Sequence, residues 1–218
     1  MRLLEHETSR AIRFFRVDSE EHGPHMARAF MDRYEFMQGP TTVEHYDMKA
    51  GVLFRGGHFN GHEIDRVQLY DVGMLAEGKE DTQALDQFID DVMTWAQTQR
   101  RLKILPTEMP ITKTYLSQLI VEFAPTPVPP NAASQSIMSA FSEAMQSSGL
   151  PPVLVNIGGF SITPDPASGA NWNFRFERRV GEPFSANKFF SSAPLSTGVH
   201  LELIEKFERI FSAQPNAS

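Results

Sequence analysis

The residues best suited to chemistry lie around a predicted β-hairpin tip. The dipeptide Asn60-Gly61 is a strong hairpin signal, and polar side chains with ligand chemistry follow and precede it. Imidazole and carboxylate groups bind zinc and other transition metals, and they also act as general acids and bases. The candidates for a metal or acid–base site are His58, His62, Glu63 and Asp65. The alternative is a solvated hairpin end, at which these side chains are simply polar.

A second group of candidates combines basic side chains with phenylalanines. Arginines in a strand can hold a carboxylate or a phosphate through two parallel hydrogen bonds, and exposed rings can anchor a protein partner. The candidates for a partner-binding or anion-binding site are Arg175, Arg179, Lys188, Phe184, Phe189 and Phe190. The alternatives are a solvated sheet face for the cations, with Glu177 and Glu182 as local partners, and core packing for the rings.

Familiar catalytic signatures are missing from the sequence. It contains no GxxxxGK[ST] phosphate loop, no GxSxG nucleophile turn, no HExxH zinc motif and no protein-kinase signature. Because the chain has no cysteine, it has no disulfide, no thiolate ligand and no cysteine nucleophile. We therefore expect no cofactor, and a non-catalytic protein is a better interpretation than an enzyme.

The first 123 residues predict an α+β core that would position the hairpin. β-forming residues predict strands over 10–17, 51–55, 64–70 and 112–123. Helices are predicted over 24–36 and 81–100, and the second has apolar residues at 3/4 spacing from Leu85 to Ala96. Asp86 and Asp90 lie opposite that stripe and are expected to face solvent. The order strand–helix–strand–strand–helix–strand predicts a ferredoxin-like, or split βαβ, sheet.

The remainder of the chain predicts an α-β-β-α extension over 135–218. A proline-rich connection at 124–134 separates it from the core at 1–123. The core has 14 basic and 20 acidic residues, whereas positions 124–218 have 6 and 7, so the acidity belongs to the core. Helices are predicted over 136–146 and 197–212, and strands over 153–157 and 171–180. The first of these helices carries Ile137, Phe141 and Met145 on one face. We expect the extension to dock on the core, and no internal repeat is evident.

The composition excludes several classes of protein. Apolar residues make up 41% of the chain and charged residues 22%, as in a globular protein. A net charge of −7 argues against a nucleic-acid partner, and no apolar run is long enough to span a membrane. The charged N-terminal segment is unlike a signal peptide, which predicts a cytoplasmic location.

The leading hypothesis is therefore a soluble cytoplasmic protein-binding or assembly protein without catalytic activity. Its expected partner is another protein or a second copy of itself. The alternative is a metal-dependent enzyme of the hydrolase type, which would use the cluster from His58 to Asp65.

Overall fold

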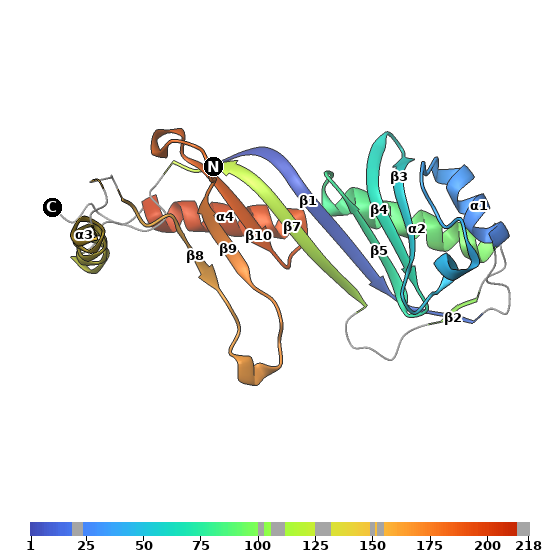
Figure 1. The fold of residues 1–218 in the computed structure, drawn as a ribbon. Helices are drawn as coiled ribbons and strands as arrows, with labels where there is room; N and C mark the ends of the chain where they lie inside the picture. The colour runs from blue at the N-terminus through green and yellow to red at the C-terminus, as the bar shows by residue number, and fades with distance from the viewer. Residues whose placement is uncertain are drawn as a thin grey trace. The chain divides into compact units, whose positions relative to one another are not determined.

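The protein is α+β, with a large antiparallel sheet and four α-helices among the described residues (Figure 1). The computed structural model describes residues 1–18, 24–99, 103–105, 112–124, 132–148, 151 and 155–212. The chain divides into two compact units. The N-terminal unit comprises His6–Gln118 and Pro194–Thr197, and the C-terminal unit comprises Met1–Glu5, Leu119–Ala193 and Gly198–Ser218.

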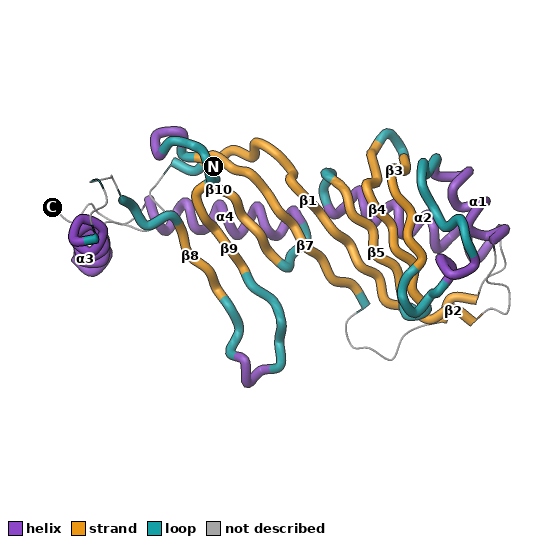
Figure 2. Tube along the Cα trace, viewed as in Figure 1, coloured by secondary structure: helices purple, strands orange, loops and turns teal. Residues whose placement is uncertain are grey.

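In the N-terminal unit, two helices accompany a sheet with the strand order β3-β4-β5-β1-β7. The strands are β1 (Arg2–Phe14), β3 (Val52–Phe59), β4 (His62–Tyr70), β5 (Gly73–Gly78) and β7 (Lys113–Glu122), and the helices are α1 (Pro24–Tyr34) and α2 (Thr82–Gln99). A short pair, β2 (Arg16–Asp18) with β6 (Lys103–Leu105), and a 3-10 turn, η1 (Val43–Tyr46), complete it. Short turns join β3, β4 and β5 (Figure 2).

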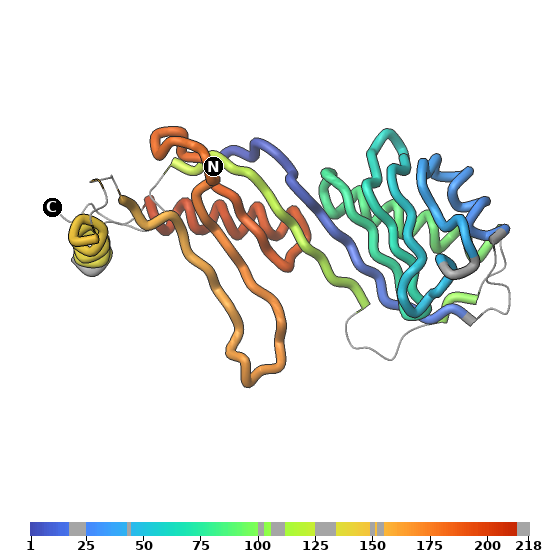
Figure 3. The backbone as a smooth tube through the Cα atoms, viewed as in Figure 1, coloured from blue at the N-terminus to red at the C-terminus, as the bar shows by residue number. Residues whose placement is uncertain are grey.

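In the C-terminal unit, β7 continues into the strand order β7-β10-β9-β8. The strands are β8 (Gly159–Ile162), β9 (Phe174–Arg178) and β10 (Lys188–Ala193), and the helices are α3 (Ala132–Ser147) and α4 (Thr197–Ser212). Two 3-10 turns, η2 (Pro166–Ser168) and η3 (Phe184–Ala186), lie in its loops. Strands β1 and β7 contribute residues to both units, and they run beside each other in Figure 3.

Apart from the short β2–β6 pair and the 3-10 turns, the two halves of the chain have the same order of elements, which the sequence did not reveal. The first half runs β1-α1-β3-β4-β5-α2, and the second runs β7-α3-β8-β9-β10-α4. Hydrogen bonds at matching positions support the correspondence. The amide of Phe15 donates to the carbonyl of Val72 at 3.1 Å, just before β5, and that of Phe123 donates to the carbonyl of Asn187 at 3.0 Å, just before β10. The fold is therefore an internal repeat of a β-α-β-β-β-α element order.

The first residues of α2 and α4 also correspond, because they bond to each other. The Thr82 amide donates to Thr197 Oγ1 at 3.1 Å, and the Thr197 amide donates to Thr82 Oγ1 at 2.8 Å. Both side chains are buried. Each threonine thus satisfies an amide that the start of a helix leaves without an intrahelical partner. We therefore take the two threonines as equivalent positions of the repeat. On this correspondence, position 82 of α2 matches 197 of α4, 85 matches 200 and 96 matches 211.

The predicted ferredoxin-like order is not confirmed, because a strand that the sequence did not predict pairs with β1. Residues Ser9 to Phe14 of β1 pair with Gly78 to Gly73 of β5, so segment 64–70 is not the neighbour of β1. The chain turns at Asp71-Val72 and re-enters the sheet at Gly73. A Cβ at Gly73 would lie 2.3 Å from the Arg13 carbonyl oxygen, so only glycine permits this close approach.

Other predictions of local structure had mixed outcomes. The apolar stripe of α2 is buried as predicted, and α4 begins and ends at the predicted residues. The predicted strand at 153–157 is wrong where it is described, because 155–158 is irregular and β8 follows it. Trp172, at the start of the predicted strand 171–180, is exposed and precedes β9. Positions 125–131 of the proline-rich connection lie outside the described residues.

Candidate functional site

The predicted hairpin at Asn60-Gly61 is confirmed, but its polar side chains do not share one face. Asn60 and Gly61 have φ values of +50° and +83°, as a tight two-residue turn requires. His58 pairs with Glu63 across the strands, and Phe59 pairs with His62. Because side chains alternate along a strand, His62 projects from the opposite face to His58 and Glu63.

The electrostatic partners of the hairpin residues lie on both faces of the sheet. His62 Nδ1 is 3.0 Å from the carboxylate of Glu80, which the sequence analysis did not include. Burial raises the pKa of Asp65, and the negative charges of Glu63 and Glu77 add to this effect. Among the described residues, no group of three or more His, Asp or Glu side chains is arranged to hold a metal ion.

The predicted basic candidates all have carboxylate partners within the chain. Arg175 donates to Glu177 at 2.8 Å, and Lys188 donates to Glu182 at the same distance. Arg179 Nη1 lies 3.5 Å from the carboxylate of Glu5. These ion pairs are half-exposed or exposed, so each contributes little to stability. An incoming anion would have to compete with them for the same cations.

Two phenylalanines of this region, Phe184 and Phe189, flank Arg178, the neighbour of the candidate Arg179. The guanidinium carbon of Arg178 lies 5.0 Å from the ring centre of Phe184 and 4.9 Å from that of Phe189. It also donates to the Phe184 carbonyl at 2.9 Å, and burial lowers its pKa. Phe189 is buried, Phe184 is partly exposed, and Phe190 is half-buried on the other side of β10. Arg178 follows Phe174 and Phe176 at the spacing of two that places side chains on one face of a strand, and this spacing was the signal in the sequence that Arg178 lies among the rings.

Two acidic residues of α2, which were expected to face solvent, instead bind other elements of the N-terminal unit. Arg13 donates to Asp86 at 2.9 Å and to Asp90 at 2.8 Å, and Tyr115 donates to Asp86 at 2.6 Å. Burial tends to raise the pKa of Asp86, but these hydrogen bonds and nearby positive charges outweigh it and lower the pKa. The network ties α2 to β1 and β7.

A buried histidine is the most strongly perturbed imidazole in the described part of the chain. His200 Nε2 lies 2.8 Å from Ser191 Oγ, and both residues are fully buried. Burial lowers the pKa of His200 to about 4, so the ring is neutral at physiological pH. A serine and a histidine at this distance resemble part of a nucleophilic site, but their burial keeps substrate away. The matching positions in the first half are Ala76 and Leu85, which supports a packing role.

The clearest difference between the two units is the exposure of one apolar residue of α4. In the N-terminal unit, the α1 rings of Phe30 and Tyr34 lie 6.1 and 6.2 Å from Trp95 of α2, which is 5% exposed. The matching residue of α4 is Ile210, which is 54% exposed. We call Phe207, Ile210 and Phe211 the α4 face; its two rings are half-buried, whereas Val92 and Ala96 at the matching positions are buried.

Helix α3 corresponds to α1 and has the same pattern of apolar residues. In α1, Met26, Phe30 and Tyr34 recur at a spacing of four and pack into the core. In α3, Ile137, Phe141 and Met145 recur at the same spacing, and we call them the α3 stripe. Ile137 is 62% exposed and Phe141 is 55% exposed. The C-terminal unit therefore has two apolar helix surfaces whose counterparts in the N-terminal unit cover each other.

Comparison with known proteins assigns no family. No model of a protein family matches the sequence, and no curated protein is significantly similar to it. None of the described helices has the length and apolar character needed to cross a membrane.

Proposed function

We propose that the protein is a non-catalytic assembly protein that pairs with a second copy of itself. In this proposal the α3 stripe of one copy packs on the α4 face of the other, and the same contact forms reciprocally. The single observation that carries the proposal is the exposure of Ile210, set against the burial of Trp95 at the matching position.

Leaving the large apolar side chains of the α3 stripe and the α4 face in water costs free energy. Burying a large aliphatic or aromatic side chain contributes roughly 1.5–3 kcal/mol relative to full exposure. Ile137, Phe141 and Ile210 are each more than half exposed. Large apolar patches exposed on the surface of a protein mark sites of interaction.

The partner is inferred from the complementarity of the two surfaces. The pairing of α1 with α2 shows that this repeat joins a stripe at four-residue spacing to the matching face of the following helix. Each chain carries both the α3 stripe and the α4 face, so each copy can cover the α4 face of the other with its own α3 stripe. Such a reciprocal contact closes as a twofold-symmetric dimer, the commonest form of self-association.

Sedimentation equilibrium of paired variants tests the proposal. We expect the wild-type protein to dimerise, and Ile210→Gln and Phe141→Gln each to dissociate the dimer. Glu205→Gln is the matched control, because it places the same side chain at an exposed position on another side of α4. It should leave the dimer intact.

Mixing the two dissociating variants separates the reciprocal dimer from other outcomes. The mixture restores one complete contact, from the α3 stripe of the Ile210→Gln chain to the α4 face of the Phe141→Gln chain. We therefore expect a heterodimer weaker than the wild-type dimer. A wild-type protein that stays monomeric while Ile210 is protected from solvent would show that α3 packs on its own chain, and the proposal would be wrong.

The sequence-based alternative of a metal-dependent enzyme stays a prediction. It would use His58, His62, Glu63 and Asp65, of which His62 lies beside Glu80. Elemental analysis of untagged protein, before and after dialysis against zinc, tests it directly. A stoichiometric metal that is lost in His62→Ala would support the alternative.

Three further statements belong to the proposal. We propose that β4, β5, β1 and β7 form a ferredoxin-like core to which β3 adds an edge strand, a hypothesis supported by their order. The domain boundary at 124–134, with a docked extension, is a proposal that limited proteolysis tests. The cytoplasmic location rests on the sequence alone, and fractionation of the native host tests it.

A further inference from the structure

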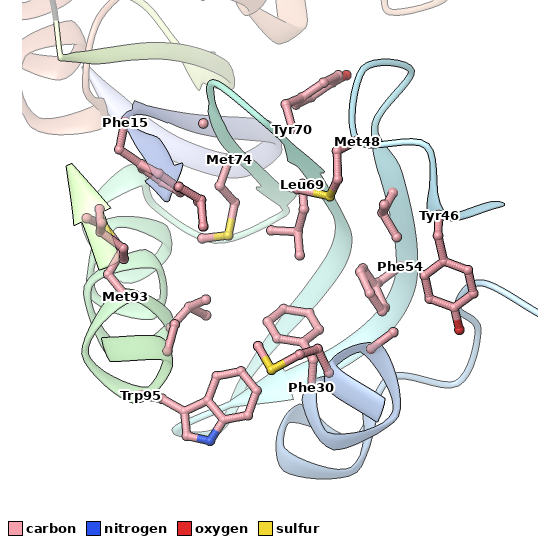
Figure 4. A pocket seen from close by; sticks show the side chains of 18 residues that line it. Phe15, Phe30, Tyr46, Met48, Phe54, Leu69, Tyr70, Met74, Met93 and Trp95 are labelled. Carbon is pink, nitrogen blue, oxygen red and sulfur yellow. The ribbon is translucent and has the colours of Figure 1, made fainter. Parts of the chain in front are cut away.

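An apolar cavity lies inside the N-terminal unit, between the two helices and the sheet (Figure 4). Its volume is about 130 Å³. Figure 4 shows Phe30 of α1, Trp95 of α2, and Leu69 and Met74 of the sheet around a common space. Nothing in the sequence analysis or in the assembly proposal uses this cavity.

The walls of the cavity differ in exposure from floor to rim. Phe30, Phe54, Met74 and Trp95 are buried and form the floor. The other large lining side chains are mostly half-buried, and we call these the rim: Val17, Met26, Tyr46, Met48, Leu69, Tyr70, Met93 and Ile104. A half-buried rim over a buried floor gives a small molecule a route from solvent to the interior.

The chemistry of the lining selects against charge and against water. None of the described residues that line the cavity has a charged side chain. An ionised group placed there would lose its hydration without gaining a counter-charge. A water molecule would need two to four polar partners, and the hydroxyl groups lie at the rim, where Tyr46 already donates to the Pro40 carbonyl at 3.3 Å. The lining therefore favours an uncharged, apolar occupant.

The size of the cavity limits the occupant to a small group. A cavity of about 150 Å³ lined by leucine, isoleucine and phenylalanine in another protein stays dry and binds benzene. The volume of about 130 Å³ found here fits one six-membered ring or a short branched hydrocarbon chain. Four methionines, Met26, Met48, Met74 and Met93, contribute to the lining. Their unbranched thioether chains adapt to different shapes and make favourable contacts with aromatic rings.

The internal repeat shows which residues create the space. Val92 and Ala96 line the cavity, and the matching positions of α4 are Phe207 and Phe211. In the C-terminal unit these two rings pack against Phe160 at 5.6 and 6.0 Å. The small side chains of α2 thus leave space beside the helix, where the matching positions of α4 carry aromatic rings.

From these observations we infer that the cavity is a binding site for a free, uncharged small molecule with a single ring or a short branched alkyl group. The buried floor of the cavity holds the apolar group, and the methionines of the rim adjust around it. The inference is independent of the assembly proposal, because the cavity lies in the N-terminal unit and the α4 face lies in the C-terminal unit.

Methyl NMR of the full chain with ¹³C-labelled methionine methyl groups tests the inference, with toluene as the probe. We expect toluene to shift the Met74 and Met93 signals in a saturable manner. The methyl signal of Met37, which is exposed and outside the lining, serves as the internal control. Benzoate, which replaces the methyl group of toluene by a carboxylate, should cause no saturable shift.

A variant taken from the repeat itself provides the second arm. Ala96→Phe places in α2 the side chain that α4 carries at the matching position, and it should abolish the response to toluene. Ala96→Leu, a smaller change, serves in its place if Ala96→Phe does not fold. The inference is overturned if toluene gives no saturable shift at Met74 or Met93, if benzoate binds as well as toluene, or if a folded filled variant still responds.

Discussion

Acidification should destabilise this protein through one buried histidine. His200 is fully buried, its Nε2 lies 2.8 Å from Ser191 Oγ, and its ring centre lies 6.0 Å from that of Phe174. Burial lowers its pKa from the ordinary 6.5 to about 4. The perturbation is the double substitution His200→Leu with Ser191→Ala, which reproduces the Leu85 and Ala76 found at the matching positions of the first half.

The magnitude follows from the difference in pKa between the unfolded and the folded chain. As the pH falls through 6.5, the unfolded chain binds a proton at His200 while the folded chain does not, so unfolding becomes more favourable. Each unit of pKa difference corresponds to about 1.4 kcal/mol, so roughly 3 kcal/mol of stability is lost between pH 6.5 and pH 4. Above pH 6.5 this contribution is fully present, and below pH 4 the loss is complete.

Urea unfolding at a pH above 6.5 and at a pH near 4 measures the effect. The wild-type protein should lose about 2–3 kcal/mol more of its free energy of unfolding over this range than the double variant, since other titrating groups act alike in both. Ser191→Ala alone is the control, because it retains the buried imidazole and should retain the pH dependence. Equal pH dependence in the wild type and the double variant would refute the reasoning.

Three smaller changes test local features of the fold. Gly61→Ala should lower the free energy of unfolding by about 1 kcal/mol, because φ there is +83°, which an alanine rarely adopts. Gly198→Ala, within α4, should instead raise the free energy of unfolding by up to about 1 kcal/mol. Urea melts compare the two variants, and a similar effect at both positions would contradict the prediction. Thr82→Ala should cost about 1–2 kcal/mol through the lost acceptor for the amide at the start of α4, and Thr82→Ser, which keeps the hydroxyl, should cost less in the same melts. Tyr115→Phe removes the 2.6 Å hydrogen bond to Asp86 and should raise the pKa of that carboxyl, as carboxyl ¹³C NMR would show; an unchanged titration would argue against the bond.

Local signals predicted those elements whose pattern matches their final environment. Helix α2 was predictable because the apolar residues of its stripe recur at helical spacing, and the stripe is buried. The hairpin was predictable because Asn60 and Gly61 both tolerate a positive φ. Strand β5 was not predicted, because its short apolar sequence has no alternation and one of its two neighbours, β1, is remote in sequence.

The candidate sites were harder to predict because partners distant in sequence determine them. Pairing of Phe59 with His62 sends His62 toward Glu80, on the opposite side from His58. Glu5, which lies beside Arg179, is much more remote in sequence. The α3 stripe was visible in the sequence, but its exposure was not, because the periodicity of a helix says nothing about which surface covers it.

The repeat offers a physical reason why its two copies differ in what they can bind. In the first, Val92 and Ala96 are small, so α2 leaves a cavity between itself and the sheet, and Phe30 of α1 forms part of its buried floor. In the second, Phe207 and Phe211 occupy the matching positions, and their rings pack against Phe160. Beside these rings Ile210 is exposed, so an apolar helix can pack against it. On the two proposals made above, one pattern of elements would bind a small ligand where its side chains are small and a helix of a protein partner where they are large.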